Sequence, residues 1–178
     1  MVPHLIVWWR TMKIQIAGLS EGVHEFSFRE PVAEVDLGEE FNGEVEVDVM
    51  LEKSGKQLYV KADVRAGGMF SCDRCTSPFS LAVRSTFQMY YLWNHGDAEL
   101  PDPAEVQVIP GGLPMIDLAD DVRQTVVLAV PLKLLCKEEC KGLCPRCGAD
   151  LNKELCICPP EALDARWETL RRFREENN

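Results

Sequence analysis

The sequence predicts an α+β fold: an antiparallel β-sheet or partial barrel with one helix packed on it, then a cysteine-rich, zinc-stapled segment with a terminal helix. Three observations support this class. Apolar and polar residues alternate in several stretches between residues 13 and 93, an amphipathic segment covers 117–130, and six of the eight cysteines fall within 136–158. We expect residues 12–130 to form the sheet and helix, and residues 131–178 to form the cysteine-rich module, packed as one unit with the sheet.

The clearest strand signals lie in the middle of the predicted sheet. In residues 44–51, acidic and apolar side chains alternate for six positions, which is the period-two pattern of a strand with one wet face. The alternation resumes at 58–64 after a Lys-Ser-Gly-Lys turn, so the two segments predict an antiparallel hairpin. Acids of the first strand would then lie beside Lys61 and Arg65 of the second. A third alternating run covers residues 81–91.

Flanking segments give weaker signals. Residues 13–40 contain short apolar alternations broken by glycines, and these predict short strands. Met12 resembles a natural start, which leaves residues 1–11 as either an extension or an extra strand. Residues 94–114 combine prolines, glycines and acids, which predicts an exposed and mobile loop.

Two helices are predicted in the C-terminal half. The first covers 117–130, with Asp117 as its cap and Pro131 at its end. Its apolar side, which we expect to pack on the sheet, is formed by Leu118, Val122, Val126 and Ala129 or Val130. The second opens at Pro159-Pro160, and its apolar residues recur at helical spacing at Leu163, Trp167, Leu170 and Phe173.

Charge is distributed unevenly along the chain. The formal net charge is −10, and all of the excess acidity lies in residues 1–130, which carry 10 Lys and Arg against 20 Asp and Glu. This balance argues against indiscriminate nucleic-acid binding. The acidic stretch 21–52 could attract a basic partner, although a solvated strand face is the simpler interpretation. The basic stretch 53–84 supplies the candidate nucleic-acid contacts, which are Lys53, Lys56, Lys61, Arg65, Arg74 and Arg84.

The cysteines predict one or two structural zinc ions. Cys-Pro-Arg-Cys-Gly at 144–148 has the form of a zinc knuckle, since zinc is held by four soft ligands and a glycine lets the backbone turn. The first-choice ligands are Cys144, Cys147, Cys156 and Cys158. A possible second site, which would tie an inter-strand loop to the C-terminal module, uses Cys72, Cys75, Cys136 and Cys140. A competing local set is Cys136, Cys140, Cys144 and Cys147. Zinc is favoured over free buried thiols, disulfides and an iron–sulfur cluster.

Several function classes are disfavoured. A catalytic zinc keeps an open position and often uses histidine or carboxylate ligands, whereas His4, His24 and His95 lie outside the cysteine cluster. No nucleophile elbow, HExxH, phosphate loop or dinucleotide fingerprint is present, so we do not expect an enzyme or a small-molecule substrate. The apolar run at residues 5–9 is too short for a membrane span, and no export signal precedes it. A reducing, cytoplasmic location with no membrane partner is expected.

The order of motifs resembles the YceD-like family of large ribosomal RNA subunit accumulation proteins, a domain of unknown function. CDRC at 72–75, KGLCPRCGADLN at 141–152, and Asp-Ala-Arg-Trp at 164–167 follow in the family's order, within a match from about residue 12 to residue 173. Many relatives would have proline where this chain has Ala165. The resemblance implies a non-enzymatic cytosolic protein that supports accumulation of large-subunit ribosomal RNA and ribosome assembly.

The resemblance also implies partners and a role for metal. The partner would be large-subunit ribosomal RNA, its precursor particle or a basic ribosomal protein. Some relatives look as though they lack most of these cysteines. The resemblance therefore implies that metal stabilises the fold and does not itself carry the function. The alternative is a redox-responsive zinc–thiolate protein with chaperone-like or adaptor activity.

Overall fold

The computed structural model describes residues 12–55, 57–93 and 105–159, and this part of the chain is mainly β. One sheet contains five strands in the order of the chain: β2 (Gly22–Pro31), β3 (Phe41–Ser54), β4 (Gln57–Ser71), β5 (Pro78–Leu92) and β6 (Val106–Val108). A second, two-stranded sheet pairs β1 (Lys13–Gln15) with β7 (Met115–Asp117). A short 3-10 helix, η1 (Val32–Glu34), precedes β3, and one α-helix, α1 (Ala119–Ala129), follows β7.

The prediction of an antiparallel sheet or partial barrel is only partly right. The pairs β2–β3, β3–β4 and β4–β5 are antiparallel, but β6 pairs with β5 in parallel, so the sheet is mixed. In the described residues β2 and β6 form the two ends of an open sheet, and no barrel closes. The strand β6 lies within residues 94–114, which were predicted to be a loop. It was not predicted because three residues are too few to give a recognisable alternation.

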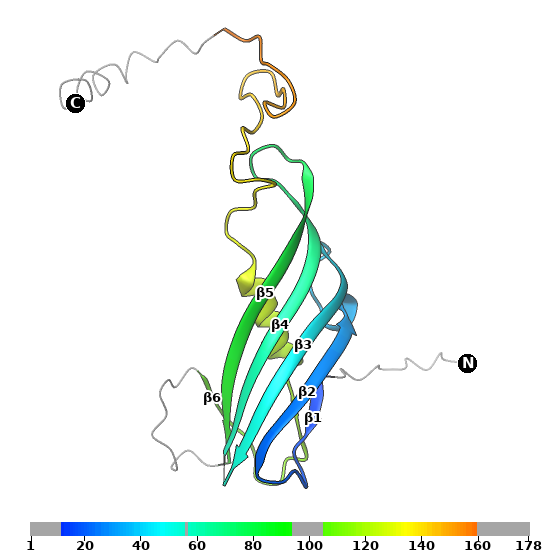
Figure 1. Cartoon of the computed structure of the whole chain (residues 1–178), viewed down its shortest axis with the longest axis vertical. Coiled ribbons are helices and arrows are strands. Elements are labelled where there is room, and N and C mark those ends of the chain that lie inside the picture. Colours follow the sequence, from blue (N-terminus) through cyan, green and yellow to red (C-terminus); the bar gives the residue numbers. More distant parts are fainter. Residues whose placement is uncertain (1–11, 56, 94–104, 160–178) are drawn as a thin grey trace, which may run out of the picture.

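Alternation along β3 and β4 places the core on one face of the sheet. In β3, Phe41 and the odd-numbered residues from Val45 to Leu51 are buried, and so are the even-numbered residues of β4, as the period-two pattern predicted. Helix α1 packs on this face against β4 and β5 (Figure 1). Its predicted apolar side is confirmed, since Leu118, Val122 and Val126 are buried together with Ala119.

The start of α1 differs from the prediction. Asp117 belongs to β7 because its segment pairs with β1, and the helix begins two residues later at Ala119. Asp117 nevertheless contributes to the helix start, since its Oδ1 accepts a hydrogen bond from the Ala119 amide at 3.0 Å. The helix ends at Ala129.

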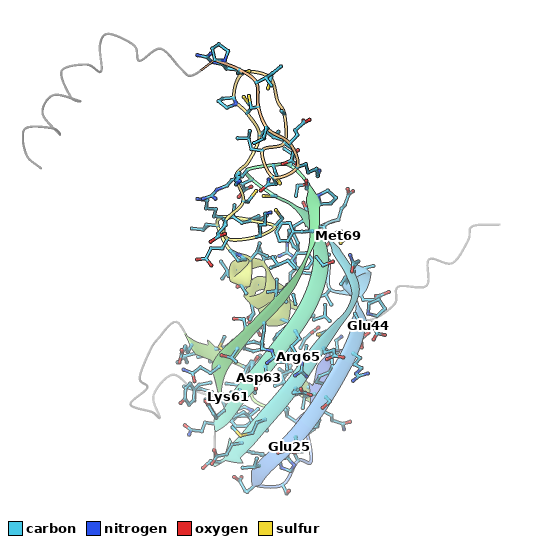
Figure 2. All side chains as sticks on the ribbon, turned by 45° about the horizontal axis from the view of Figure 1, so that its top comes forward. Glu25, Glu44, Lys61, Asp63, Arg65 and Met69 are labelled. Carbon is cyan, nitrogen blue, oxygen red and sulfur yellow. The ribbon has the colours of Figure 1, made fainter. Side chains whose placement is uncertain are left out.

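The other face of the sheet is polar, and cross-strand ion pairs cover part of it. Arg65 on β4 lies opposite Glu46 on β3, with 3.3 Å between its Nε and Glu46 Oε2, and its guanidinium also contacts Asp48. The expected pairing of Arg65 with acids of β3 is confirmed, whereas Lys61 lies opposite Met50. Ser27 donates a hydrogen bond to Asp48 Oδ1 at 2.9 Å. This bond lowers the pKa of Asp48, and the hydrogen bond and charge of Arg65 lower it further. We call this surface the polar face (Figure 2).

Residues 131–159 leave the end of α1 and continue beyond the far end of the β4–β5 hairpin (Figure 1). They contain no strand or helix but many turns, and one isolated bridge joins Leu143 to Asp150. The predicted terminal helix, the extension at 1–11 and Lys56 lie outside the described residues. Within the described ranges, no helix has the length and apolar character needed to cross a bilayer.

Candidate metal centres

The first candidate centre begins at the tip of the β4–β5 hairpin. Cys72 and Cys75 lie in the connection between the strands, where the Cys72 amide donates to Ser77 O at 3.0 Å and the Thr76 amide to Cys72 O at 2.8 Å. These bonds close a tight loop, in which Thr76 adopts a positive φ of 58°. The loop is therefore held by its own backbone and by two long strands, and it presents both sulfurs from a fixed support.

Two residues between these cysteines hold the later segment against the loop. Asp73 forms a pair of bonds with Leu134: its amide donates to Leu134 O at 2.8 Å, and its Oδ2 accepts from the Leu134 amide at 2.7 Å. Arg74 donates from Nη1 to Cys140 O at 2.7 Å. Cys136 and Cys140 are thereby brought across from the loop cysteines.

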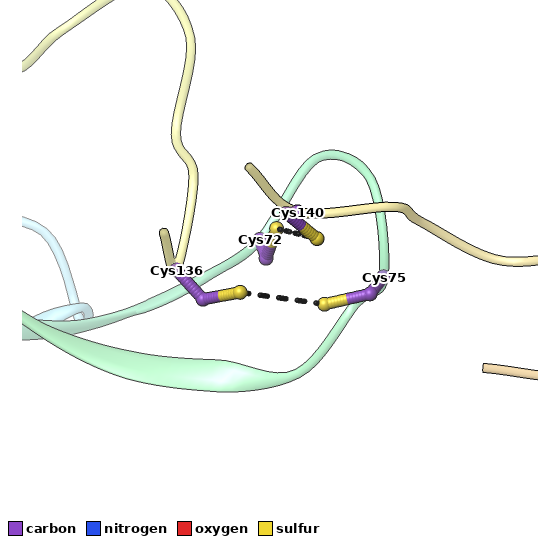
Figure 3. Close-up of side chains that lie close together, drawn as sticks. All are labelled: Cys72, Cys75, Cys136 and Cys140. Atoms are coloured by element: carbon purple, nitrogen blue, oxygen red, sulfur yellow. Dashed lines mark hydrogen bonds between the residues drawn. The ribbon is translucent and has the colours of Figure 1, made fainter. Parts of the chain in front are cut away.

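Four sulfurs converge at this point (Figure 3). The Cys75 and Cys136 sulfurs are 3.6 Å apart, and those of Cys72 and Cys140 are 3.8 Å apart. Cys72, Cys75 and Cys140 are buried, with Leu135, Leu143 and Phe79 packed around them. The first centre, defined as Cys72, Cys75, Cys136 and Cys140, is thus a largely enclosed set of donors.

The second candidate centre is local in sequence. Within its knuckle the Cys144 amide donates to Ala149 O at 2.8 Å and the Gly148 amide to Cys144 O at 2.9 Å, with Gly148 at a φ of +74°. This turn places Cys147 beside Cys144. Cys156 completes the approach, with its sulfur 3.3 Å from that of Cys144 and 3.6 Å from that of Cys147. The second centre, defined as Cys144, Cys147, Cys156 and Cys158, is more open, since Cys147 is exposed.

The sulfur spacing fits one tetrahedral ion in each centre. All four sulfurs of a set lie within 4.8 Å of one another. A metal–sulfur distance of about 2.3 Å gives tetrahedral edges of about 3.8 Å, whereas a disulfide would need sulfurs at about 2.05 Å. All eight cysteines are free thiols in this structure. The donor sets therefore suit a soft, four-coordinate ion such as zinc.

The thiols of each set differ in acidity. The Cys136 amide lowers the pKa of Cys72 to about 6, and the Cys147 and Arg146 amides lower the pKa of Cys144 to about 6. Burial raises the pKa of Cys136 to about 12, and the contact with Cys156 raises the pKa of Cys158 to about 12. Four crowded thiolates repel one another, and a divalent cation would supply the charge that lets all four ionise.

The structure brings together the two four-cysteine sets named from the sequence. The competing set, which combined Cys136 and Cys140 with Cys144 and Cys147, is not formed. Sequence spacing alone did not separate these arrangements, because the pairing depends on where the hairpin tip meets the later segment. Metal ligation by the two sets remains a prediction.

The candidate nucleic-acid residues do not form one patch. Lys61, Arg65 and Arg84 lie on the polar face, where Arg65 and Arg84 are cross-strand neighbours. Lys53 donates to Leu19 O at 2.6 Å, and Arg74 is part of the first centre's support. Lys56 lies outside the described residues. A nucleic-acid role for these side chains stays a prediction.

Sequence reasoning missed the supporting residues of the centres. Asp73, Arg74, Gly142 and Asn152 all lie inside or beside the cysteine motifs, and each bonds or packs across them. The available signal was their position, since Asp73 and Arg74 separate two cysteines and Gly142 and Asn152 flank the knuckle. The partners of Asp73 and Arg74 could not be predicted from the sequence, because they lie more than 60 residues away along the chain.

Gly142 offers a test of how the centres meet the hairpin tip. Gly142 and Gly148 both have positive φ, 78° and 74°, but a Cβ at Gly142 would approach Arg74 O at 3.0 Å while one at Gly148 would meet nothing within 4 Å. We expect both Gly→Ala variants to lose about 1–2 kcal/mol of stability through backbone strain. Gly142→Ala should lose at least about 1 kcal/mol more, because the contact with the hairpin tip must open. Thermal unfolding of the zinc-loaded protein measures the difference, and equal losses would contradict this account.

Fold and site together define a class: a mainly β protein whose open sheet carries two compact four-cysteine candidate metal centres at one end. The family model described as "Large ribosomal RNA subunit accumulation protein YceD" matches residues 60–174, which include most of β4, all of β5 and α1, and both centres. This chain belongs to the YceD family.

Curated relatives agree with this assignment. The chain is similar to large ribosomal RNA subunit accumulation protein YCED homolog 1, chloroplastic, of Arabidopsis thaliana, with 26% identity over 160 residues, 75% of this chain and 49% of the relative. It is also similar to an uncharacterized protein of Mycobacterium tuberculosis, with 29% identity over 132 residues, 71% of this chain and 60% of the relative. The chain thus spans about half to three fifths of these relatives' lengths. No solved structure matches significantly.

Proposed function

We propose that this protein is a non-enzymatic, zinc-stabilised factor that supports the accumulation of large-subunit ribosomal RNA, and with it the assembly of the large ribosomal subunit. The observation that carries the proposal is membership of the YceD family over residues 60–174. The match includes the sheet hairpin and the cysteine segment together, so the proposed activity is assigned to the joined unit and not to an isolated zinc module.

Zinc is proposed as a structural component. Both donor sets consist of thiols alone, and four-thiolate zinc is closed to substrate or to an activated water. The first centre would join the hairpin tip to residues 136–140. Apart from it, residues 134–143 are held to this tip by hydrogen bonds of Asp73 and Arg74. Metal binding would therefore fix the C-terminal segment relative to the sheet and stabilise the surfaces of both.

The polar face supports a basic protein as the partner more than it supports RNA. Its described strand residues carry six acids and four bases, with Asp63 between Lys61 and Arg65 along β4 (Figure 2). The acids are Glu25, Glu44, Glu46, Asp48, Glu52 and Asp63, and the bases are Arg29, Lys61, Arg65 and Arg84. A surface with more acids than bases repels phosphate groups and attracts polypeptides rich in lysine and arginine. Ribosomal proteins are commonly of this kind.

Depletion of the protein in its source cells tests the proposed function. We expect the ratio of large- to small-subunit ribosomal RNA to fall, and expression of the intact chain to restore it. An unchanged ratio on complete depletion would overturn the proposal. The partner is identified by affinity purification with and without ribonuclease: a ribosomal protein retained after ribonuclease supports the basic-protein partner, and its loss supports RNA.

One observation favours a redox-responsive role for the second centre. Cys147 is exposed and Cys156 and Cys158 are partly exposed, whereas three of the four sulfurs in the first centre belong to buried residues. Oxidants reach accessible thiolates first, so mild peroxide should release zinc from the second centre before the first. If release of zinc makes the protein bind unfolded client proteins, a chaperone-like role is supported. If no such binding appears, zinc has a structural role alone.

A further inference from the structure

Asn152 lies in the turn after the knuckle, yet its side chain bonds to the first centre. Its Nδ2 donates to the Cys140 sulfur at 3.4 Å and to Asp150 Oδ1 at 2.8 Å, and its Oδ1 accepts from the Lys141 amide at 2.9 Å. Both the NH2 group and the oxygen of the Asn152 side chain are thus hydrogen-bonded, with partners within residues 140–150. The side chain therefore connects the turn that follows the second centre's knuckle with a sulfur of the first centre.

The position of Asn152 is itself fixed by the base of the knuckle. The backbone amide of Asn152 donates to Asp150 Oδ1 at 3.0 Å, and Asp150 forms the β-bridge with Leu143 that closes the knuckle. Lys153 holds the other oxygen of Asp150 at 2.9 Å, and this pair lowers the pKa of Asp150 to about 2. The Leu151 amide donates to Gly142 O at 3.0 Å. Asn152 can reach Cys140 only when the base of the knuckle is formed.

We propose that the two centres load metal in order, the first before the second, and that Asn152 is the positioning residue that couples them. The inference rests on the zinc binding included in the proposed function. A metal-bound thiolate is a stronger hydrogen-bond acceptor than a mobile thiol, and it is held in one place. Filling the first centre therefore fixes Asn152, which fixes the base of the knuckle, and the second centre is then partly assembled before its ion arrives.

The supports of the two centres give the order. Two ligands of the first centre stand on the β4–β5 hairpin, whose loop is closed by its own hydrogen bonds, so only Cys136 and Cys140 must be ordered on binding. All ligands of the second centre belong to residues 144–158. Within the described chain, the hydrogen bonds that join this region to what precedes it end on residues 140–143. The second centre thus loses more conformational entropy on binding unless the first has already been filled.

Coupling is measured on the full chain with Co²⁺ as the probe, since four-thiolate Co²⁺ absorbs in the visible. The first centre is disabled by Cys72→Ser with Cys75→Ser, which leaves Cys140 in place, and the second by Cys156→Ser with Cys158→Ser. In the intact chain one equivalent of Zn²⁺ fills the first centre, and Co²⁺ then reports on the second. We expect the second centre to bind Co²⁺ about 10-fold more weakly when the first is disabled.

Asn152 variants assign the coupling to the side chain. Asn152→Leu removes both the donor and the acceptor, Asn152→Asp keeps an acceptor for Lys141 but loses the donor to sulfur, and Glu154→Gln is the control in the same exposed turn. Both Asn152 variants should weaken the first centre by about 10-fold and make the second indifferent to the first. The control should change neither.

A spectroscopic signature separates this role from general loss of structure. With the second centre disabled and the first saturated with Co²⁺, loss of the N–H···S bond should move the sulfur-to-metal charge-transfer band to lower energy, because the sulfur lone pairs are no longer stabilised. An unmoved band, retained coupling in Asn152→Leu, or equal second-centre affinity with the first centre filled and disabled would each overturn the proposal. Absence of metal binding in the intact chain would instead refute the zinc staple itself.

Discussion

Replacing Cys75 by serine is expected to reduce bound zinc from two ions to about one per chain and to release residues 131–143 from the hairpin tip. Cys75 is buried and its sulfur lies 3.6 Å from that of Cys136, so serine removes one of four ligands from an enclosed site. Structural zinc contributes about 10–16 kcal/mol of binding free energy at neutral pH, and three thiolates cannot retain most of it. Metal analysis and amide hydrogen exchange of residues 131–143 measure the two effects.

Cys156→Ser is the matched control, because it removes one sulfur from the second centre only. It should also reduce zinc by about one ion per chain. Protection of residues 131–143 should be retained, since Asp73, Arg74 and the first centre still hold this segment. Equal loss of protection in both variants would show that the first centre is not what joins the segment to the sheet.

Replacing Val122 by aspartate is expected to destabilise the fold by more than about 4 kcal/mol, because an unpaired carboxylate would be buried between α1 and the sheet. Val122 is 0% exposed, and it lies on the helix side that packs on β4 and β5. Chemical denaturation of the zinc-loaded protein, followed by far-ultraviolet circular dichroism, measures the change in unfolding free energy.

Val127→Asp provides the comparison on the same helix. Val127 is 49% exposed, so its carboxylate remains hydrated and the change in stability should stay within about 0.5 kcal/mol. Similar losses in the two variants would mean that α1 does not pack on the sheet through the face described above.

The long strands and the helix were predictable because their burial follows a simple period. Alternation located the middle of β3, the first half of β4 and most of β5, and helical spacing located the buried side of α1. The short alternation at the start of residues 13–40 indicated β1, whereas β6 and β7 are too short for a periodic signal and exist through pairing with β5 and β1. Pairing with β1 also displaced the helix start from Asp117, where capping chemistry alone would have placed it.

The candidate centres were predictable in their residues but not in their supports. Thiol chemistry and the knuckle glycine were enough to name two sets of four cysteines, with a local set as competitor. The decision between them depends on the Asp73–Leu134 and Arg74–Cys140 hydrogen bonds, which bring the hairpin tip to a segment 61 and 66 residues later. Such contacts leave no local pattern, because the charged side chains of Asp73 and Arg74 would be equally suited to solvent.

The long sequence separation between Cys72 and Cys140 has a consequence during synthesis. These two residues are 68 positions apart, and the hairpin that carries the first pair of cysteines is complete well before the second pair exists. A metal crosslink across such a loop would remove about 4 kcal/mol of unfolded-chain entropy, but only once both ends are present. The first centre is therefore a late closing step. A nascent or truncated chain that stops before residue 136 would display an intact hairpin with only the thiols of Cys72 and Cys75, and would differ in metal content from the finished protein.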